Sequence, residues 1–234
     1  MADLVLQSLP PMLGVRTASP FTAKAEALLA MSGLPHRIEH VSDPRKAPRG
    51  KLPVLLDGGT AVPDSEHIRR HLETVHGVDF DGWLSDEQRA VATAFRRLAE
   101  HHLYFIAGNM RWNLHPDAVR DNYFATIPAP VRRVVFRLIL RGVNKGYHEM
   151  GLGRHTIAQQ TAFVEEDFAA ISTQLGENDF LLGDRPASID ATMFGTLHQA
   201  LDCTLRTPVT DAAERHANLR PYLRRMKERF FPEA

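Results

Sequence analysis

A hydroxyl residue directly before a proline, at the start of an amphipathic run, is the feature of this sequence best suited to chemistry. Ser19 precedes Pro20 and Phe21, and apolar residues follow at helical spacing from Ala25 to Met31. This order predicts a helix with Ser19 as its N-cap and Pro20 in its first position. Because a helix N-terminus carries partial positive charge and unpaired N–H groups, it stabilises an anion, and a serine hydroxyl there can donate a hydrogen bond. Ser19 is therefore either a plain cap or part of an anion site.

Histidines offer a second kind of chemistry, because the chain has 12 of them. His101 and His102 are neighbours in a helical pattern, so their side chains point about 100° apart and cannot hold one ion. His67 and His71 are four residues apart and can share a helix face, but no glutamate or cysteine completes a HExxH-type set with them. We therefore expect no metal.

Composition narrows the classes of function. The chain has 234 residues, enough for one large domain or two small ones, with 28 Lys+Arg against 28 Asp+Glu. This balance argues against broad binding of nucleic acid, which needs a net basic face. The single cysteine, Cys203, excludes a disulfide scaffold and a CxxC motif and suits a reducing compartment. We expect a cytoplasmic protein that does not bind nucleic acid.

Two segments bear on membranes. Residues 1–12 have no basic n-region and only a short apolar stretch, so we expect no signal peptide. The longest apolar run, at 131–143, is interrupted by arginines, so we expect no transmembrane anchor. The wider stretch 131–146 is either a solvated helix face or a surface for an anionic membrane or partner. Its basic residues are Arg132, Arg133, Arg137, Arg141 and Lys145.

The elements that must position Ser19 belong to a first part, residues 1–78, with the order strand, helix, strand, hairpin, helix. We expect them at residues 4–9, 19–33, 36–41, 53–62 and 67–76. Gly33 ends the first helix, and Asp57-Gly58-Gly59 forms the hairpin turn. Because the second strand follows the first through a helix, we expect the two to pair in parallel in a right-handed βαβ unit.

The second part, residues 86–234, follows a linker and has helical patterns almost to its end. Helices are expected from 86 to about 114, from 123 to 145 with interruptions at Pro128 and Pro130, at 156–175, at 188–205, and around 222–230. The first of them places Val91, Ala94, Phe95, Leu98, His102, Phe105 and Ile106 on one face. The helix at 188–205 is apolar nearly all round, which predicts a buried central position.

Four stretches in the same order resemble the glutathione S-transferase superfamily. They are Ser19-Pro20-Phe21, Lys51-Leu52-Pro53-Val54-Leu55, Pro63-Asp64-Ser65 with Ile68, and Gly183-Asp184-Arg185-Pro186 through Asp190. Within the superfamily the chain is most similar to the failed-axon-connections and metaxin-like branch, through Gly151–His155 and Asp190–Gly195. The resemblance implies a thioredoxin-like α/β N-terminal domain (βαβ-ββα) and an all-α C-terminal helical domain, and it implies a homodimer.

The resemblance also implies a glutathione site in the first part. Pro53 matches the family's cis-proline, after which the backbone of Leu52 pairs with the cysteinyl part of glutathione. Asp64 and Ser65 match the acidic-serine pair that holds the γ-glutamyl carboxylate at a helix N-terminus. Lys51 is a candidate partner for a glutathione carboxylate. The alternatives are an ordinary proline at a strand start, a plain helix cap and a solvated lysine.

In this family setting Ser19 becomes the candidate stabiliser of the glutathione thiolate, with Thr22 as the second candidate. A free thiol has a pKa of about 8.5, so little of it is ionised at neutral pH. Ser19 acts as a hydrogen-bond donor in this scheme and needs no histidine base. Where some relatives carry cysteine, this chain has serine and threonine, which disfavours glutaredoxin-like thiol transfer.

The electrophile would lie against the first helices of the second part. His101, Tyr104, Phe105, Met110 and Trp112 are the candidates to line that pocket, although Phe105 and Met110 also suit a core. The expected function is a glutathione S-transferase that conjugates glutathione to a small hydrophobic electrophile. The alternative is a non-catalytic protein of the same fold that binds ligands or other proteins, as in the metaxin-like branch.

Asp190 matches the family's buried helix-capping aspartate. Ala187 stands where the family usually has the capping serine or threonine, and Ser188 is the candidate to replace it. This motif concerns folding and not catalysis.

Overall fold

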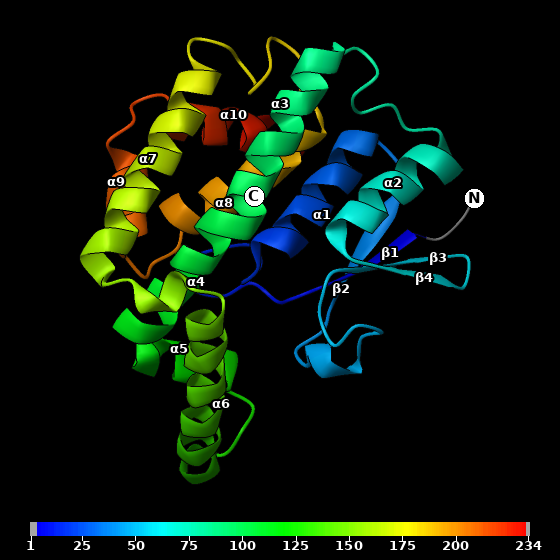
Figure 1. Ribbon diagram of the computed structural model, residues 1–234. Coiled ribbons are helices and arrows are strands. Elements are labelled where there is room, and N and C mark those ends of the chain that lie inside the picture. The colour runs from blue at the N-terminus through cyan, green and yellow to red at the C-terminus, as the bar shows by residue number, and fades with distance from the viewer. Residues whose placement is uncertain (1–3, 233–234) are drawn as a thin grey trace.

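The strand patterns of the first part form one four-stranded sheet in the computed structural model, which describes residues 4–232 (Figure 1). The strands are β1 (Leu4–Ser8), β2 (His36–His40), β3 (Val54–Asp57) and β4 (Thr60–Pro63), in the order β2-β1-β3-β4. β1 pairs with β2 in parallel, and β3 is antiparallel to both β1 and β4. The predicted parallel pair and the hairpin are both confirmed.

Two helices with clear end signals pack against each other beside this sheet, α1 (Pro20–Ser32) and α2 (Ser65–His76). Ser19 is the N-cap of α1, as predicted, and its Oγ accepts a hydrogen bond of 3.2 Å from the backbone N–H of Phe21. Gly33 ends α1 in the left-handed conformation, with φ 68°. α2 begins two residues earlier than predicted, because Asp64 caps it.

The rest of the described chain is helical, with the helical part beside the sheet in Figure 1. Its helices are α3 (Asp86–Arg97), α4 (Tyr104–Leu114), α5 (Pro116–Tyr123), α6 (Ala129–Glu149), α7 (Ile157–Leu175), α8 (Ser188–Leu201), α9 (Pro208–Glu214) and α10 (Leu219–Phe230). A π-helical segment, Leu98–Leu103, joins α3 to α4. The prediction missed α5 and α9. It also wrongly placed a break at Pro130, which lies in the first turn of α6, where its missing N–H costs nothing.

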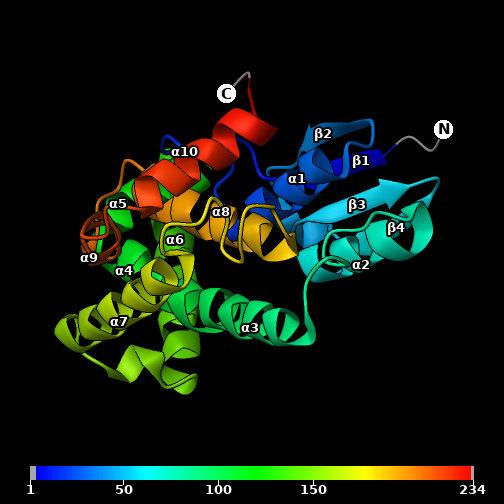
Figure 2. The same cartoon turned by 90° about the horizontal axis from the view of Figure 1, so that it is seen from above.

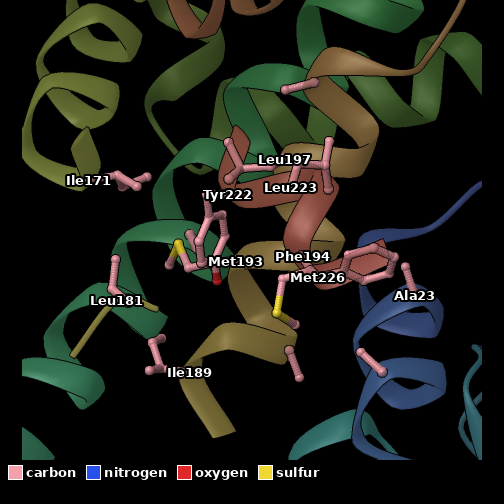
Figure 3. Close-up of a cluster of buried hydrophobic side chains, with 14 of the residues drawn as sticks. Ala23, Ile171, Leu181, Ile189, Met193, Phe194, Leu197, Tyr222, Leu223 and Met226 are labelled. Carbon is pink, nitrogen blue, oxygen red and sulfur yellow. The ribbon is translucent and has the colours of Figure 1, made fainter. Parts of the chain in front are cut away.

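α8 is the buried central helix, as its all-round apolar pattern predicted. It lies between α10 on one side and α3 on the other (Figure 2). Met193, Phe194 and Leu197 of α8 meet Tyr222 of α10 and Ile171 of α7 in the core (Figure 3). α8 also crosses the start of α1 closely, because a Cβ on Gly195 would lie 2.3 Å from the carbonyl oxygen of Pro20.

The face that the first long helix buries differs from the predicted one. The buried residues are Ala92, Arg96, Ala99, Leu103, Ile106, Asn109 and Met110, and of these only Ile106 belongs to the predicted face. The predicted face counted large apolar residues, but Val91, Phe95 and Leu98 only pack at the margin of the core. Small alanines allow closer packing, and Arg96 is held inside by Ser188 and by an ion pair of 3.5 Å with Glu66.

α6 carries the basic stretch and projects from the helical part (Figure 1). Phe136 faces inward and stacks on Trp112, with 6.0 Å between ring centroids. Val131, Val134 and Leu138 are exposed on the same helix. Across residues 4–232, no helix is both long and apolar enough to cross a membrane.

Asp190 is buried, and its hydrogen bonds connect α8 to α10 and to the chain before α8. Its Oδ1 accepts from the N–H of Leu181 (2.9 Å) and from the Tyr222 hydroxyl (2.7 Å), and its Oδ2 accepts from the N–H of Ala187 (2.8 Å). Ser188 does not replace the missing cap, contrary to expectation. Its hydroxyl instead donates to Asp81 in the linker between α2 and α3.

Candidate functional site

One cavity of about 620 Å³ brings together the residues that the sequence singled out in the two parts of the chain. It opens against Ser19 at the start of α1 and extends to the aromatic side chains of α4 and α5. The residues proposed for glutathione and for the electrophile line this same cavity: Ser19, Lys51, Leu52, Pro53, Asp64, Ser65, His101, Tyr104, Phe105 and Trp112. Met110 lies in the core instead.

Ser19 and Thr22 have different surroundings. Ser19 is partly exposed and lines the cavity. Thr22 is 0% exposed, and its hydroxyl is 2.6 Å from that of Thr17 and donates to the carbonyl of Ser19 at 2.9 Å. Thr22 therefore supports the turn from within, while Ser19 and the first residues of α1 line the cavity.

The segments proposed for glutathione are joined by their backbones. The Leu52–Pro53 peptide bond is cis, as expected. The carbonyl of Pro53 accepts a hydrogen bond of 3.1 Å from the N–H of Asp64. Asp64 has φ 84°, a conformation that a side chain other than glycine rarely adopts, and such strain concentrates at functional sites. Next to it, Ser65 begins α2 and is buried at 3% exposure.

The loop before Ser19 is held by the helical part of the chain. The N–H of Arg16 donates to Nε2 of His198 (2.9 Å), so this imidazole nitrogen is the unprotonated one. Gln199 Nε2 donates to the carbonyl of Thr17 (2.7 Å). The Tyr123 hydroxyl donates to the carbonyl of Ala18 (3.4 Å). Sequence reasoning missed these groups, because nothing local marks a partner more than 100 residues away.

A buried ion network forms another wall of the cavity. Lys24 of α1 is 1% exposed, and its Nζ lies 3.1 Å from Glu66 of α2 and 2.7 Å from Glu100 of the π-helical segment. Burial raises the pKa of Glu66, but hydrogen bonds from Arg69 and the charges of Lys24 and Arg96 outweigh it and lower this pKa to about 2. The network joins α1 and α2 to the first helices of the second part.

Aromatic rings form the side proposed for the electrophile. Tyr104 packs edge to face on Phe21, with 4.8 Å between centroids, and on Phe105 at 4.9 Å. His101 is exposed at the cavity, 3.3 Å from Arg97. Sequence reasoning missed Arg111, Tyr123 and Tyr147, which also line the cavity.

One group of side chains has the composition of a metal site. Asp57, His71 and His76 have ligand atoms within 4.8 Å of one another, at the far end of β3 from Pro53. Each imidazole Nε2 lies 2.7 Å from the same Oδ2 of Asp57. Ligands of a tetrahedral zinc ion lie about 3.3 Å apart, so these distances are those of hydrogen bonds. The sequence considered His71 with His67, whereas the structure brings it to His76 and Asp57.

Comparisons with known proteins agree with this architecture. The chain combines a small mixed sheet with a helical part, and residues of both line one cavity. Two family models match, the glutathione S-transferase N-terminal domain over residues 20–118 and the glutathione S-transferase C-terminal domain over residues 164–226. The isoprene-epoxide–glutathione S-transferase of Rhodococcus sp. (strain AD45) is 30% identical over 229 residues, covering 94% of this chain and 96% of that protein. The chain belongs to the glutathione S-transferase superfamily.

Other relatives confirm the expected branch. Failed axon connections of Drosophila melanogaster is 27% identical, over 92% of this chain but 55% of that longer protein. Metaxin-1 of Mus musculus is 28% identical, over 86% of this chain and 67% of that protein. A solved glutathione S-transferase of Ceriporiopsis subvermispora in complex with glutathione has the same fold, with a TM-score of 0.65 at 18% identity, and the match covers 99% of this chain and 100% of that one.

Proposed function

We propose that this protein is a glutathione transferase that acts on a small hydrophobic electrophile. The observation that carries the proposal is one cavity lined by Ser19, by the Leu52–Pro53 and Ser65 segments, and by Tyr104 and Phe105. Glutathione would pair with the backbone of Leu52, place its γ-glutamyl carboxylate at Ser65 and direct its sulfur to Ser19.

In this mechanism Ser19 lowers the pKa of the glutathione thiol. A shift of two units from about 8.5 needs about 2.7 kcal/mol of differential stabilisation. One hydroxyl donor and the N-terminal N–H groups of α1 have contributions of that order. The thiolate then attacks the electrophilic carbon, a C–S bond forms, and the leaving group departs with its electron pair. Lys51, exposed at the cavity, would pair with a carboxylate of glutathione.

The second candidate is a ligand-binding or protein-interaction role without turnover. The observation that favours it is the similarity to failed axon connections and metaxin-1. For both candidates we propose that the protein is a homodimer. We also propose a cytoplasmic location, because a single cysteine suits a reducing compartment.

The deciding experiment is calorimetry of glutathione binding together with the ultraviolet absorbance of the bound thiolate. We expect wild type to bind glutathione and to lower its thiol pKa. Ser19→Ala should still bind glutathione, but the thiol pKa should return to that of free glutathione. Thr22→Val is the matched control, since it removes the buried hydroxyl, and it should leave the thiol pKa lowered. If millimolar glutathione does not bind, the transferase proposal fails and the interaction protein is the better account. Binding with an unshifted thiol would contradict the role of Ser19.

A further inference from the structure

Arg111 is a cation in the cavity wall that has no acidic partner. Its Nη1 donates to the Tyr123 hydroxyl (3.3 Å) and to Oε1 of Gln199 (3.0 Å), and both acceptors are neutral. Within residues 4–232, Arg111 forms no ion pair, and its Nε and Nη2 have no hydrogen-bond partner. The side chain is only partly exposed, at the cavity. A guanidinium so placed is costly unless a ligand brings a negative charge to it.

Further hydroxyl groups near Arg111 are also without partners. Tyr104 and Tyr147 line the cavity, and among the described residues neither hydroxyl has a hydrogen-bond partner. The Tyr147 hydroxyl reaches α4 one turn before Arg111, since a Cβ on Gly108 would lie 2.4 Å from it. Burial raises the pKa of both tyrosines, so they remain protonated and can donate to an anion at neutral pH.

α8 contributes a third hydroxyl group that has no partner among the described residues. Thr192 lines the cavity and is 3% exposed, and its buried hydroxyl oxygen has no hydrogen-bond partner. It lies two helical turns before Gln199, which holds Arg111, so both side chains lie on the same face of α8. Unpartnered buried hydroxyls are rare in folded proteins, and this one can form a hydrogen bond to a ligand in the cavity.

The acidic residues of the cavity are engaged elsewhere. They are Asp64, Glu66 and Glu100. Glu66 and Glu100 pair with Lys24, and Asp64 caps α2 through the N–H of Glu66. The cavity therefore offers Arg111 no carboxylate of its own.

We propose that Arg111, with the hydroxyls of Tyr104 and Tyr147, forms a subsite for a carboxylate on the second substrate. The open edge of a guanidinium matches a carboxylate with two parallel hydrogen bonds. This inference rests on the proposed transferase function and narrows its substrate class. The electrophile has a small apolar body, held among the aromatic rings, and carries a carboxylate that stays intact while sulfur attacks another carbon.

Binding is tested first without glutathione, using 3,5-dinitrobenzoate and its neutral methyl ester, neither of which can react. By calorimetry we expect wild type to bind the carboxylate at least about tenfold more tightly than the ester. Arg111→Met should remove this preference, and Arg111→Lys should retain part of it. Arg133→Met, on the exposed side of α6, is the matched control for the loss of one positive charge and should keep the preference. Circular dichroism confirms that each variant is folded.

Turnover is tested with 4-chloro-3,5-dinitrobenzoate, its methyl ester and 1-chloro-2,4-dinitrobenzene. In each, the thiolate bonds to the ring carbon and chloride leaves. We expect Arg111→Met to raise KM for the carboxylate at least about tenfold more than it raises KM for either neutral substrate.

The outcomes separate the two proposals. Equal binding of carboxylate and ester by wild type overturns the subsite without requiring any variant. Loss of glutathione affinity in Arg111→Met, with no change for dinitrobenzoate, also overturns it, because Arg111 then serves a carboxylate of glutathione. A carboxylate preference without conjugation of any electrophile would support the subsite and reject the transferase. Conjugation without a carboxylate preference would support the transferase and reject the subsite.

Discussion

The side-chain amide of Gln199 holds the carbonyl of Thr17 at 2.7 Å, although 182 residues separate the two. The same amide accepts from Arg111 through its oxygen. α8 is thereby connected both to the loop that presents Ser19 and to the cation in the cavity wall.

Replacing this amide should therefore affect both stability and the glutathione site. For Gln199→Met we expect a loss of about 1–3 kcal/mol in the free energy of unfolding, since a buried carbonyl loses its donor. The pKa of the thiol of bound glutathione should also rise, because Gln199 no longer holds the loop before Ser19. Urea unfolding and thiolate absorbance measure the two effects. Gln174→Met is the control, because Gln174 donates to the Leu181 carbonyl away from the cavity, and it should leave the thiol pKa unchanged.

Gly195 sets how closely α8 approaches the start of α1. In Gly195→Ala the new methyl group would lie 2.3 Å from the Pro20 carbonyl oxygen, so the backbone next to Ser19 must move. We expect a loss of about 1–3 kcal/mol in stability together with weaker glutathione binding. Gly142→Ala in α6 is the matched control, since apart from the adjacent backbone of α6 nothing lies within 4 Å of its added Cβ. It should stabilise by about 0.5–1 kcal/mol. Unchanged glutathione affinity in Gly195→Ala would contradict the proposed coupling.

Glu66 should stabilise the fold in a pH-dependent way. Its pKa is about 2 in the folded protein, below its value of about 4.3 in the unfolded chain. Its contribution is therefore fully present above the unfolded value and is lost as pH falls from about 4.3 toward 2. Glu66→Gln should cost about 3 kcal/mol at pH 7 and progressively less below pH 4.3. Urea unfolding of wild type and Glu66→Gln across this pH range tests the direction of the effect. A stability difference that grows as pH falls would contradict the prediction.

Asp190 should show the opposite pH dependence. Burial raises its pKa to about 6, against hydrogen bonds from Ala187, Leu181 and Tyr222. Asp190→Asn cannot accept all three bonds, so we expect it to cost about 3 kcal/mol or more. Because the folded pKa is raised, the contribution is largest below the unfolded value of about 3.9 and falls as pH rises through 6. The difference between wild type and Asp190→Asn should thus be greater at pH 4.5 than at pH 7.5, as urea unfolding would measure.

Local signals predicted much of the fold. The cap at Ser19, the helix end at Gly33 and the turn at Asp57-Gly58-Gly59 each depend on neighbours in the sequence, and all three are present. Other local patterns misled, and the long helix from Asp86 is one example. There the apolar pattern favoured Phe95 and Leu98, but close helix packing selected small residues and an ion-paired arginine.

The candidate site was predictable only in part. Motif residues such as Ser19, Pro53 and Ser65 could be found by resemblance, and they line one cavity. Arg111 and Tyr147 could not, because an arginine or tyrosine on a helix becomes informative only when its neighbours in space are known. The same holds for His198, whose role depends on the N–H of Arg16 far along the chain.

The loop before Ser19 takes its support from α5 and α8, and this limits how the protein can be divided. Residues 4–76 contain Ser19, Pro53 and Ser65 but none of the three side chains that bind the backbone groups of Arg16, Thr17 and Ala18. A protein fragment of only that segment would thus contain the motif residues but lack the contacts that hold the loop before Ser19. Exchange of the sheet-containing half between relatives, as an interchangeable module, would succeed only when the matching residues of α5 and α8 are exchanged with it.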